Sequence, residues 1–180
     1  MQCGAALQVV LGLAFNWGAI LGWVAVHGDV HWPVVAPLYA SCILWTLHYD
    51  TIYAHQVAPG RQRRLLPTRA AGRRDPSQDK RDDVRAGVRS TALRLGDRSG
   101  VFLAACSGGT VTGIGIAGAV AGLHPSFYCA LVAAAGHLAW QVRTVNFADR
   151  ADCLRKFQSN RDLGAIVFAA IVLGRACGCG

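Results

Sequence analysis

Four aspartates determine the chemistry that this 180-residue sequence predicts. Asp50 ends an apolar segment, and Asp79, Asp82 and Asp83 follow a stretch of different composition, Val57–Gln78. Carboxylates that lie close together repel one another unless a cation joins them. Mg²⁺ binds in proteins through a few carboxylates together with the phosphate oxygens of a substrate. The residue types therefore predict a site for Mg²⁺ and diphosphate, with a solvated charged loop at the end of a membrane span as the alternative.

The spacing of these residues becomes regular once Val57–Gln78 is set aside. Asp79 then stands seven positions after Asp50, and Tyr53 stands three positions after it. Asp83 falls at the eleventh position, and positions 0, 3, 7 and 11 share one face of a helix. Basic residues beside these carboxylates can hold a polyanion. They are Lys80, Arg81, Arg85 and Arg89.

The stretch Val57–Gln78 differs from both of its flanks. It contains six Arg and one Asp, and so contributes +5 of the net charge of +8. Its prolines, glycines and paired arginines predict a disordered basic insert at residues 57–78. Without this insert the chain is only mildly basic and carries no nucleic-acid-binding motif, so we expect no nucleic-acid partner.

The segments that must position the aspartates are apolar and long enough to cross a membrane. The chain is 53% hydrophobic and 16% charged, whereas a soluble domain is typically about 25% charged. The sequence therefore predicts an all-α, polytopic membrane bundle. Predicted spans cover residues 5–26, 34–54, 101–122 and 126–142, and a shorter fifth apolar run covers residues 163–174.

Polar and small residues inside these spans predict how the helices pack. We expect Asn16 and His137 to form hydrogen bonds with neighbouring helices, because an apolar span offers them few other partners. Gly109 and Gly113 have the spacing that lets two helix backbones approach closely. We expect no phosphate-binding loop there, because no Lys-Ser or Lys-Thr pair follows the glycines.

The basic residues predict which ends of the spans lie together. Residues 57–100 contain twelve Lys and Arg, and the predicted polar loop 143–162 contains five. The short turns His27–Pro33 and Leu123–Pro125 contain none. Alternating spans place both basic segments on one side, and the positive-inside rule makes that side the cytoplasm or the mitochondrial matrix. We therefore expect the aspartates to face that compartment.

With the insert removed, the sequence resembles the UbiA family of membrane prenyltransferases. It is most similar to the branch that prenylates 4-hydroxybenzoate in ubiquinone synthesis, including its mitochondrial members. The resemblance covers nearly the whole chain outside the insert and the extreme C-terminus. The segments that carry it are Leu11–Trp23, Pro37–Gln56, Asp79–Gly96 and Lys156–Phe168.

The resemblance implies a bundle of about nine spans, of which this chain supplies five as a partial domain over residues 1–180. It implies Mg²⁺ as cofactor, polyprenyl diphosphate and 4-hydroxybenzoate as substrates, and the lipid bilayer and other ubiquinone-biosynthesis proteins as partners. The implied location is the mitochondrial inner membrane with the Asp motif facing the matrix, or the cytoplasmic face of a bacterial plasma membrane. The implied catalytic residues are Asp50, Asp79 and Asp83, the metal ligands are these with Asp82, and the substrate contacts are Tyr53, Lys80, Arg81 and Arg89.

The sequence departs from the family pattern in one further way. The family's first Asp-rich motif, of the form NDxxDxxxD, does not occur in these 180 residues. The resemblance therefore assigns the chain to the C-terminal half of the bundle, and we expect little or no turnover by this chain alone. Two alternatives stay open: a non-catalytic membrane fragment or isoform, and a UbiA-type prenyltransferase with another aromatic acceptor.

Overall fold

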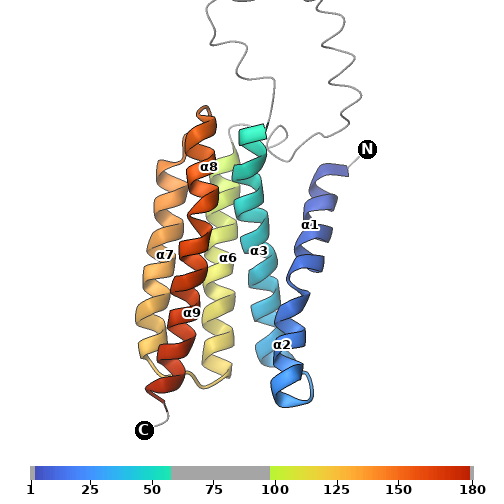
Figure 1. Cartoon of the computed structure of the whole chain (residues 1–180), viewed down its shortest axis with the longest axis vertical. Coiled ribbons are helices and arrows are strands. Elements are labelled where there is room, and N and C mark those ends of the chain that lie inside the picture. The colour runs from blue at the N-terminus through green and yellow to red at the C-terminus, as the bar shows by residue number, and fades with distance from the viewer. Residues whose placement is uncertain (1–2, 58–97, 179–180) are drawn as a thin grey trace, which may run out of the picture.

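The computed structural model describes the backbone of residues 3–57 and 98–178, and the side chains of residues 9–55 and 98–178. Every regular element within these ranges is a helix, which confirms the predicted all-α class (Figure 1). The insert predicted at residues 57–78 and the aspartates that follow it lie outside the described side chains. The helices are α1 (Cys3–Phe15), α2 (Trp17–His27), α3 (Trp32–Val57), α6 (Ser99–Val120), α7 (Ser126–Thr144), α8 (Arg150–Gln158) and α9 (Asn160–Ala176).

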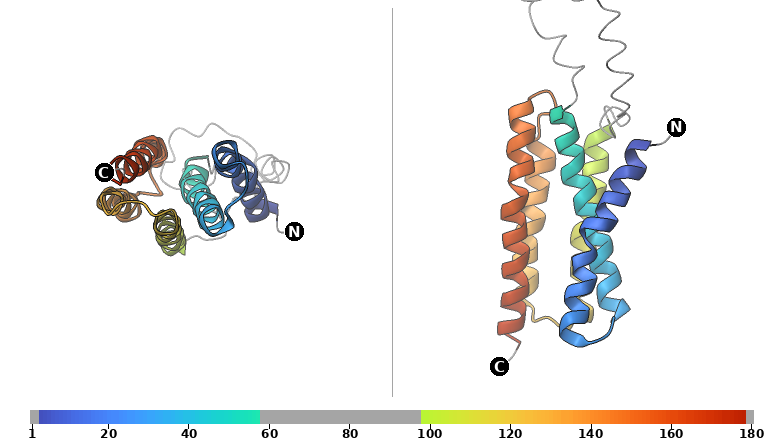
Figure 2. Two further views of the ribbon diagram at one scale, coloured as in Figure 1. Left: turned by 90° about the horizontal axis from the view of Figure 1, so that it is seen from below. Right: turned by 45° about the vertical axis from the view of Figure 1, so that its right-hand side comes forward.

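Helix α3 is the central element of this bundle. Seen end-on, α1 and α2 lie on one side of α3, and α7 and α9 lie on the other (Figure 2). Its closest partner is α6, and a Cβ atom added at Gly113 of α6 would lie 2.7 Å from the Pro37 carbonyl oxygen and 2.8 Å from Ser41 Cβ. The predicted close approach of two backbones at this glycine is confirmed, because no larger residue fits without displacing α3.

Two apolar clusters hold the helices together. The larger cluster joins α6, α7 and α9 through residues such as Phe127, Leu138 and Leu163, each at most 2% exposed. The smaller cluster consists of Ile52 of α3, Leu103 of α6 and Cys153 of α8. It lies near the end of the bundle at which α3 finishes and α6 begins, and so it fixes α8 at that end.

The order of the helices matches the predicted alternation. The turns from α2 to α3 and from α6 to α7 lie at one end of the bundle, and the segment between α7 and α9 lies at the other (Figure 1). Two segments are long and apolar enough to cross a membrane by length and composition, residues Val9–His27 and Ser99–Val120. The other predicted spans remain predictions.

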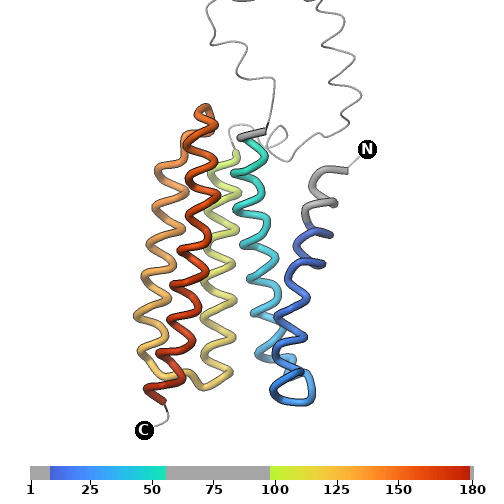
Figure 3. The backbone as a smooth tube through the Cα atoms, viewed as in Figure 1, coloured from blue at the N-terminus to red at the C-terminus, as the bar shows by residue number. Residues whose placement is uncertain are grey.

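The span predicted over residues 5–26 agrees in length and composition with the segment Val9–His27, but its helix is interrupted at Asn16. Helix α1 ends at Phe15 and α2 begins at Trp17, and the change of direction is visible in the backbone trace (Figure 3). The Asn16 side chain donates to the carbonyl oxygen of Gly12 at 2.7 Å and to Thr46 Oγ1 at 2.9 Å. The second bond confirms the expected contact with a neighbouring helix.

The polar loop predicted over residues 143–162 is also corrected, because it contains the nine-residue helix α8. Asp149 begins this helix, and its carboxylate accepts a hydrogen bond from the backbone N–H of Ala151 at 2.9 Å. A single turn at Ser159 separates α8 from α9. Helix α9 starts three residues earlier than the predicted apolar run, at Asn160.

Candidate functional site

Helix α3 carries polar residues on more than one face near its C-terminal end. Successive residues of a helix turn by about 100°, so His48 and Asp50 point in directions about 200° apart. His48 is completely buried, whereas Asp50 is half-buried. The two residues therefore face different surroundings.

Only Asp50 and Tyr53 of the predicted site lie within the described side chains. Both belong to the last two turns of α3, at the end of the bundle that also holds α8. Tyr53 is 40% exposed, and its ring lies 5.0 Å, centroid to centroid, from the ring of Phe157 in α8. The remaining predicted residues lie outside the described part of the chain. They are Asp79, Lys80, Arg81, Asp82, Asp83 and Arg89.

An aromatic wall, defined here as Trp45, Tyr49, Tyr53 and Phe157, lies beside this end of α3. The three α3 residues are four positions apart and therefore share a face. The Tyr49 ring lies 5.8 Å from that of Phe157, and Trp45 lies 6.4 Å from Tyr49. Such a wall offers a flat apolar surface on the same part of α3 as the Asp50 carboxylate. It is suited to contact with an aromatic ring or an unsaturated chain.

The aromatic wall is fixed to α9 by one direct hydrogen bond. Trp45 Nε1 donates to Asn160 Oδ1 at 2.8 Å. The Asn160 amide nitrogen in turn donates to the carbonyl oxygens of Lys156 and Phe157, each at 3.1 Å. This asparagine therefore connects the end of α8 with α3, and it holds Phe157 in place.

The face of α3 toward α1 is also polar. Thr46 Oγ1 accepts the hydrogen bond from Asn16 and lies 3.3 Å from the hydroxyl oxygen of Tyr49, which donates to it. The Tyr39 hydroxyl donates to the carbonyl oxygen of Leu13 at 2.6 Å, one turn before the helix break. Asp50 stands one turn beyond Thr46 on the same face. The break at Asn16 therefore lies beneath the position of Asp50.

On the side of α3 that packs on α6, a buried polar network connects four helical segments. His48 Nε2 lies 2.9 Å from Gln141 Oε1 of α7. The Gln141 amide nitrogen donates to the Lys156 carbonyl oxygen at 3.1 Å and to Ser159 Oγ at 2.8 Å. His48 Nδ1 lies 3.0 Å from Ser107 Oγ of α6. Sequence reasoning missed this network, although Gln141 is a strongly polar residue in an otherwise apolar stretch.

The Lys156 carbonyl oxygen fixes the orientation of the Gln141 amide. A carbonyl oxygen only accepts, so the Gln141 group next to Lys156 O is the amide nitrogen. Its Oε1 therefore faces His48, whose Nε2 carries the proton and donates. His48 Nδ1 lies 3.0 Å from Ser107 Oγ, and the Ser107 hydroxyl donates to the Leu103 carbonyl oxygen at 2.8 Å. His137 Nε2 lies 3.2 Å from Gln141 Nε2, one turn away on the same helix. Gln141 in turn bonds to Lys156 and Ser159 at the α8–α9 junction.

Helix α8 is held by charged residues as well. Lys156 Nζ donates to Thr144 Oγ1 at 2.6 Å and lies 3.3 Å from the centre of the Trp140 ring. Burial lowers the pKa of the Lys156 ammonium, and the Asp152 carboxylate opposes this by raising it. The backbone N–H of Asn146 donates to Asp152 Oδ2 at 2.8 Å and lowers the pKa of that carboxyl, against the smaller opposing effect of burial.

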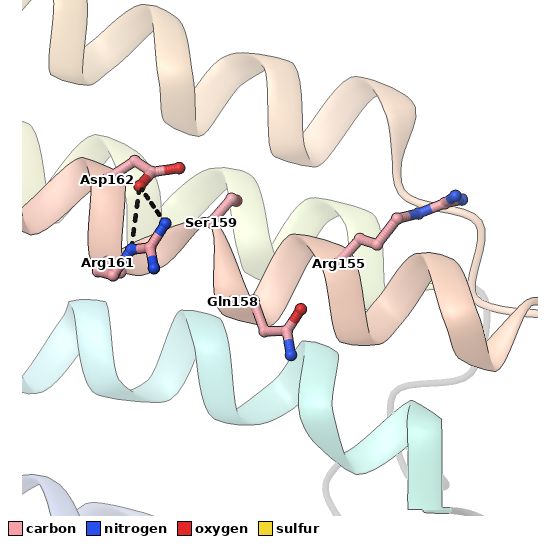
Figure 4. Close-up of a pocket in the computed structure, with 5 residues that line it drawn as sticks. All are labelled: Arg155, Gln158, Ser159, Arg161 and Asp162. Carbon is pink, nitrogen blue, oxygen red and sulfur yellow. Dashed lines mark hydrogen bonds and ion pairs between the residues drawn. The ribbon is translucent and has the colours of Figure 1, made fainter.

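A pocket of about 470 Å³ opens at the junction of α8 and α9. Figure 4 shows the side chains that line it, with Gln158 extending from the end of α8 and Arg161 turned toward Asp162. Arg161 donates to Asp162 Oδ1 from Nε and from Nη2, each at 3.3 Å. The lining residues are Arg155, Gln158, Ser159, Arg161 and Asp162.

Most of the ligands of the predicted magnesium site lie outside the described side chains. Among the described residues, no three His, Cys, Asp or Glu side chains gather closely enough to hold a metal ion. Asp50 alone of the predicted ligands is described, and its carboxylate oxygens are the donor type that Mg²⁺ takes. The predicted ligands, all carboxylates, therefore have the type of donor atom that Mg²⁺ binds.

The sequence matches one family model and several characterised proteins. The model describes the UbiA prenyltransferase family and matches residues 76–171, a range that contains Asp79, Asp82 and Asp83. A mitochondrial 4-hydroxybenzoate polyprenyltransferase of Arabidopsis thaliana is 43% identical over 169 residues, which are 94% of this chain and 36% of that protein. No solved structure matches the chain.

Proteins of the same name in other organisms are similar to a comparable extent. The Homo sapiens protein is 42% identical over 167 residues, 93% of this chain and 39% of that protein. The Dictyostelium discoideum protein is 39% identical over 168 residues, 93% of this chain and 32% of that protein. The chain thus spans about a third to two fifths of the length of these relatives.

Proposed function

Because this chain belongs to the UbiA prenyltransferase family, we propose that it takes part in prenyl transfer to 4-hydroxybenzoate in ubiquinone biosynthesis. A polyprenyl group would pass from polyprenyl diphosphate to the aromatic ring. The observation that carries this proposal is the identity of 39–43% to proteins of that name over 93–94% of the chain. These relatives are longer, so the proposal assigns the chain one part of the complete site.

The four predicted carboxylates have the first role in this proposal. Asp50, Asp79, Asp82 and Asp83 would hold Mg²⁺, which when bound stabilises the negative charge of the departing diphosphate. The oxygen donors of these residues are the ligands that this hard cation prefers. Asp50 stands at the end of α3 beside the aromatic wall, so a diphosphate bound there has apolar surface next to it.

The remaining predicted residues would bind and orient the substrates. Lys80, Arg81 and Arg89 would neutralise diphosphate oxygens, since charged donors bind phosphate strongly. Tyr53, whose ring contacts Phe157, would present its face to the unsaturated chain or to the acceptor ring. The same apolar surface would keep water away from the reacting carbon, so that the aromatic ring is the nucleophile that attacks it.

We further propose a multi-pass location in the mitochondrial inner membrane, with the carboxylates on the matrix side. Two segments have the length and composition of membrane spans, and the relatives are named as mitochondrial proteins. The segment between α7 and α9, which is basic, lies at the same end of the bundle as Asp50 (Figure 1). The positive-inside rule supports the proposed orientation.

Transfer to labelled 4-hydroxybenzoate tests the function directly. Membranes containing the full chain would receive polyprenyl diphosphate and Mg²⁺, with and without a second polypeptide that carries NDxxDxxxD and the preceding spans of a relative. We expect little product from the chain alone and clear product from the pair. Substantial turnover by the chain alone would contradict the first expectation.

Two outcomes would support the alternative functions. If the pair forms no product but the two polypeptides purify together, the chain is a non-catalytic membrane component. If product forms only with a different aromatic acid, the acceptor is wrong while the family assignment holds. The assay therefore separates the three candidates.

A further inference from the structure

The pocket at the junction of α8 and α9 is not used by the proposed transfer reaction. Its polar groups are two guanidinium groups, an amide, a hydroxyl and one carboxylate. The side chain of Arg155 is 71% exposed and that of Arg161 is 89% exposed. Exposed guanidinium groups beside a pocket bind phosphate well, because each presents several N–H donors in one plane.

The charge of the pocket fits a ligand with a single negative charge. Arg155 and Arg161 contribute +2 and Asp162 contributes −1, which leaves a net charge of +1 in the lining. Asp152, outside the lining, pairs with Arg155 Nη2 at 3.3 Å. A phosphodiester carries one negative charge and matches the net charge of the lining. A prenyl diphosphate carries more negative charge than these two guanidinium groups balance, because each already pairs with a carboxylate, Arg155 with Asp152 and Arg161 with Asp162. Charge complementarity therefore favours a phosphodiester.

An apolar track, defined as Ala165, Phe168 and Val172, begins directly below the pocket. These residues follow Arg161 at intervals of four, seven and eleven positions, so they share its face of α9. All are exposed, Phe168 by 70% and Val172 by 48%. Eleven residues of helix rise by about 16 Å, roughly half of the 30 Å hydrocarbon core of a bilayer. A polar pocket above an apolar track of this length has the shape of one lipid molecule.

We propose that the pocket binds the phosphate of an anionic phospholipid, with an acyl chain along the apolar track of α9. Arg155 and Arg161 bind the phosphate oxygens, and the Gln158 amide donates to a further oxygen. Asp162 keeps Arg161 in position from the other side, through the two bonds to Oδ1. A zwitterionic headgroup binds more weakly, because its ammonium meets the arginines. This inference does not depend on the proposed transfer reaction.

Lipid binding is measured by native mass spectrometry of the full chain in a mild detergent. Phosphatidylglycerol and phosphatidylcholine are titrated separately against the wild type and the double variant Arg155→Gln/Arg161→Gln. We expect phosphatidylglycerol to bind the wild type, and the double variant to lose roughly 25-fold in affinity, about fivefold for each arginine. Phosphatidylcholine should bind the two proteins to a similar, weaker extent.

The matched control is Arg143→Gln/Arg175→Gln, which removes the same charge at two other exposed positions. It should bind phosphatidylglycerol like the wild type. The proposal is overturned if this control loses as much affinity as the pocket variant, if the pocket variant binds like the wild type, or if phosphatidylcholine binds as tightly as phosphatidylglycerol. Displacement of phosphatidylglycerol by an equal concentration of farnesyl diphosphate would also overturn it and would make the pocket a diphosphate site.

Discussion

His48 and Asp50 stand two residues apart on α3, yet they lie in opposite surroundings. His48 is completely buried, and both of its ring nitrogens have partners on other helices. Asp50 is half-buried, at the end of the helix where the predicted motif continues. A buried polar group without a partner costs free energy, so both ring nitrogens of the buried His48 need hydrogen-bond partners. The polar residues of one helix are thus divided between packing and proposed ligand binding according to the face they occupy.

The largest expected effect comes from breaking the buried side of this comparison. In Gln141→Leu, the buried His48 N–H loses its acceptor, whereas the Lys156 carbonyl oxygen keeps its donors on Ser159 and Asn160. We expect the free energy of unfolding to fall by about 2 kcal/mol, since a buried unpaired group costs roughly 1–3 kcal/mol. Unfolding in mixed detergent micelles, followed by circular dichroism, measures the change.

Gln158→Leu is the matched control for this variant. Gln158 is exposed at the end of α8, so the same substitution there should change the unfolding free energy by less than about 0.5 kcal/mol. Equal destabilisation by the two variants would show that the buried network does not hold α3, α7 and α8 together.

The second prediction addresses the other face of α3. Asp50→Asn keeps the size of the side chain but removes its charge, so we expect Mg²⁺-dependent binding of farnesyl diphosphate to weaken roughly 30-fold, about 2 kcal/mol. The unfolding free energy should change little, because Asp50 is only half-buried. Tritiated farnesyl diphosphate bound to the chain in nanodiscs measures the effect, either for the chain alone or for the pair of polypeptides.

Asp29→Asn removes the same charge from the turn between α2 and α3, at the far end of the bundle. It should leave diphosphate binding unchanged. If Asp29→Asn and Asp50→Asn change the affinity for farnesyl diphosphate equally, the end of α3 is not a diphosphate site. The two faces of α3 would then not differ in function.

The sequence predicted the apolar helices and the ends at which they meet, because apolar length and basic loops report these features directly. It missed the break at Asn16, where the neighbours Phe15 and Trp17 give no local signal. The break depends on a tertiary contact, since the side chain of Asn16 bonds both to Gly12 of its own helix and to Thr46 of α3. Local pattern cannot reveal a partner thirty residues away.

Helix α8 was missed for a different reason. Its charge density suggested a loop, although Asp149 is a good N-terminal cap, and Cys153 and Phe157 are four positions apart. The candidate site was predicted by residue type through Asp50 and Tyr53, but the aromatic partner Phe157 and the buried Gln141 were not. These two belong to α7 and α8, so only the packing of helices distant in sequence identifies them.

A third prediction sharpens the comparison at the boundary between the two faces, where Trp45 connects α3 to Asn160. Trp45→Phe keeps an aromatic ring but removes the donor to Asn160 Oδ1, and we expect a loss of about 1 kcal/mol in unfolding free energy. A double-mutant cycle with Asn160→Ala isolates the hydrogen bond. Additive effects of the two substitutions would show that the bond does not couple the helices.

The smallest expected effect concerns Asp152, which anchors α8 outside the buried network. The pKa of its carboxyl is lowered in the folded protein, mainly by the hydrogen bond from the Asn146 backbone N–H. The stabilisation is therefore present above the ordinary pKa of an aspartate and is lost as the pH falls through the lowered value. Asp152→Asn removes this contribution, so its loss of stability between pH 7 and pH 3 should be smaller than that of the wild type. Identical pH dependence in the two proteins would mean that the Asp152 carboxylate contributes nothing to the position of α8 beside α3. Helix α8 would then be held by Lys156, Gln141 and apolar contacts alone.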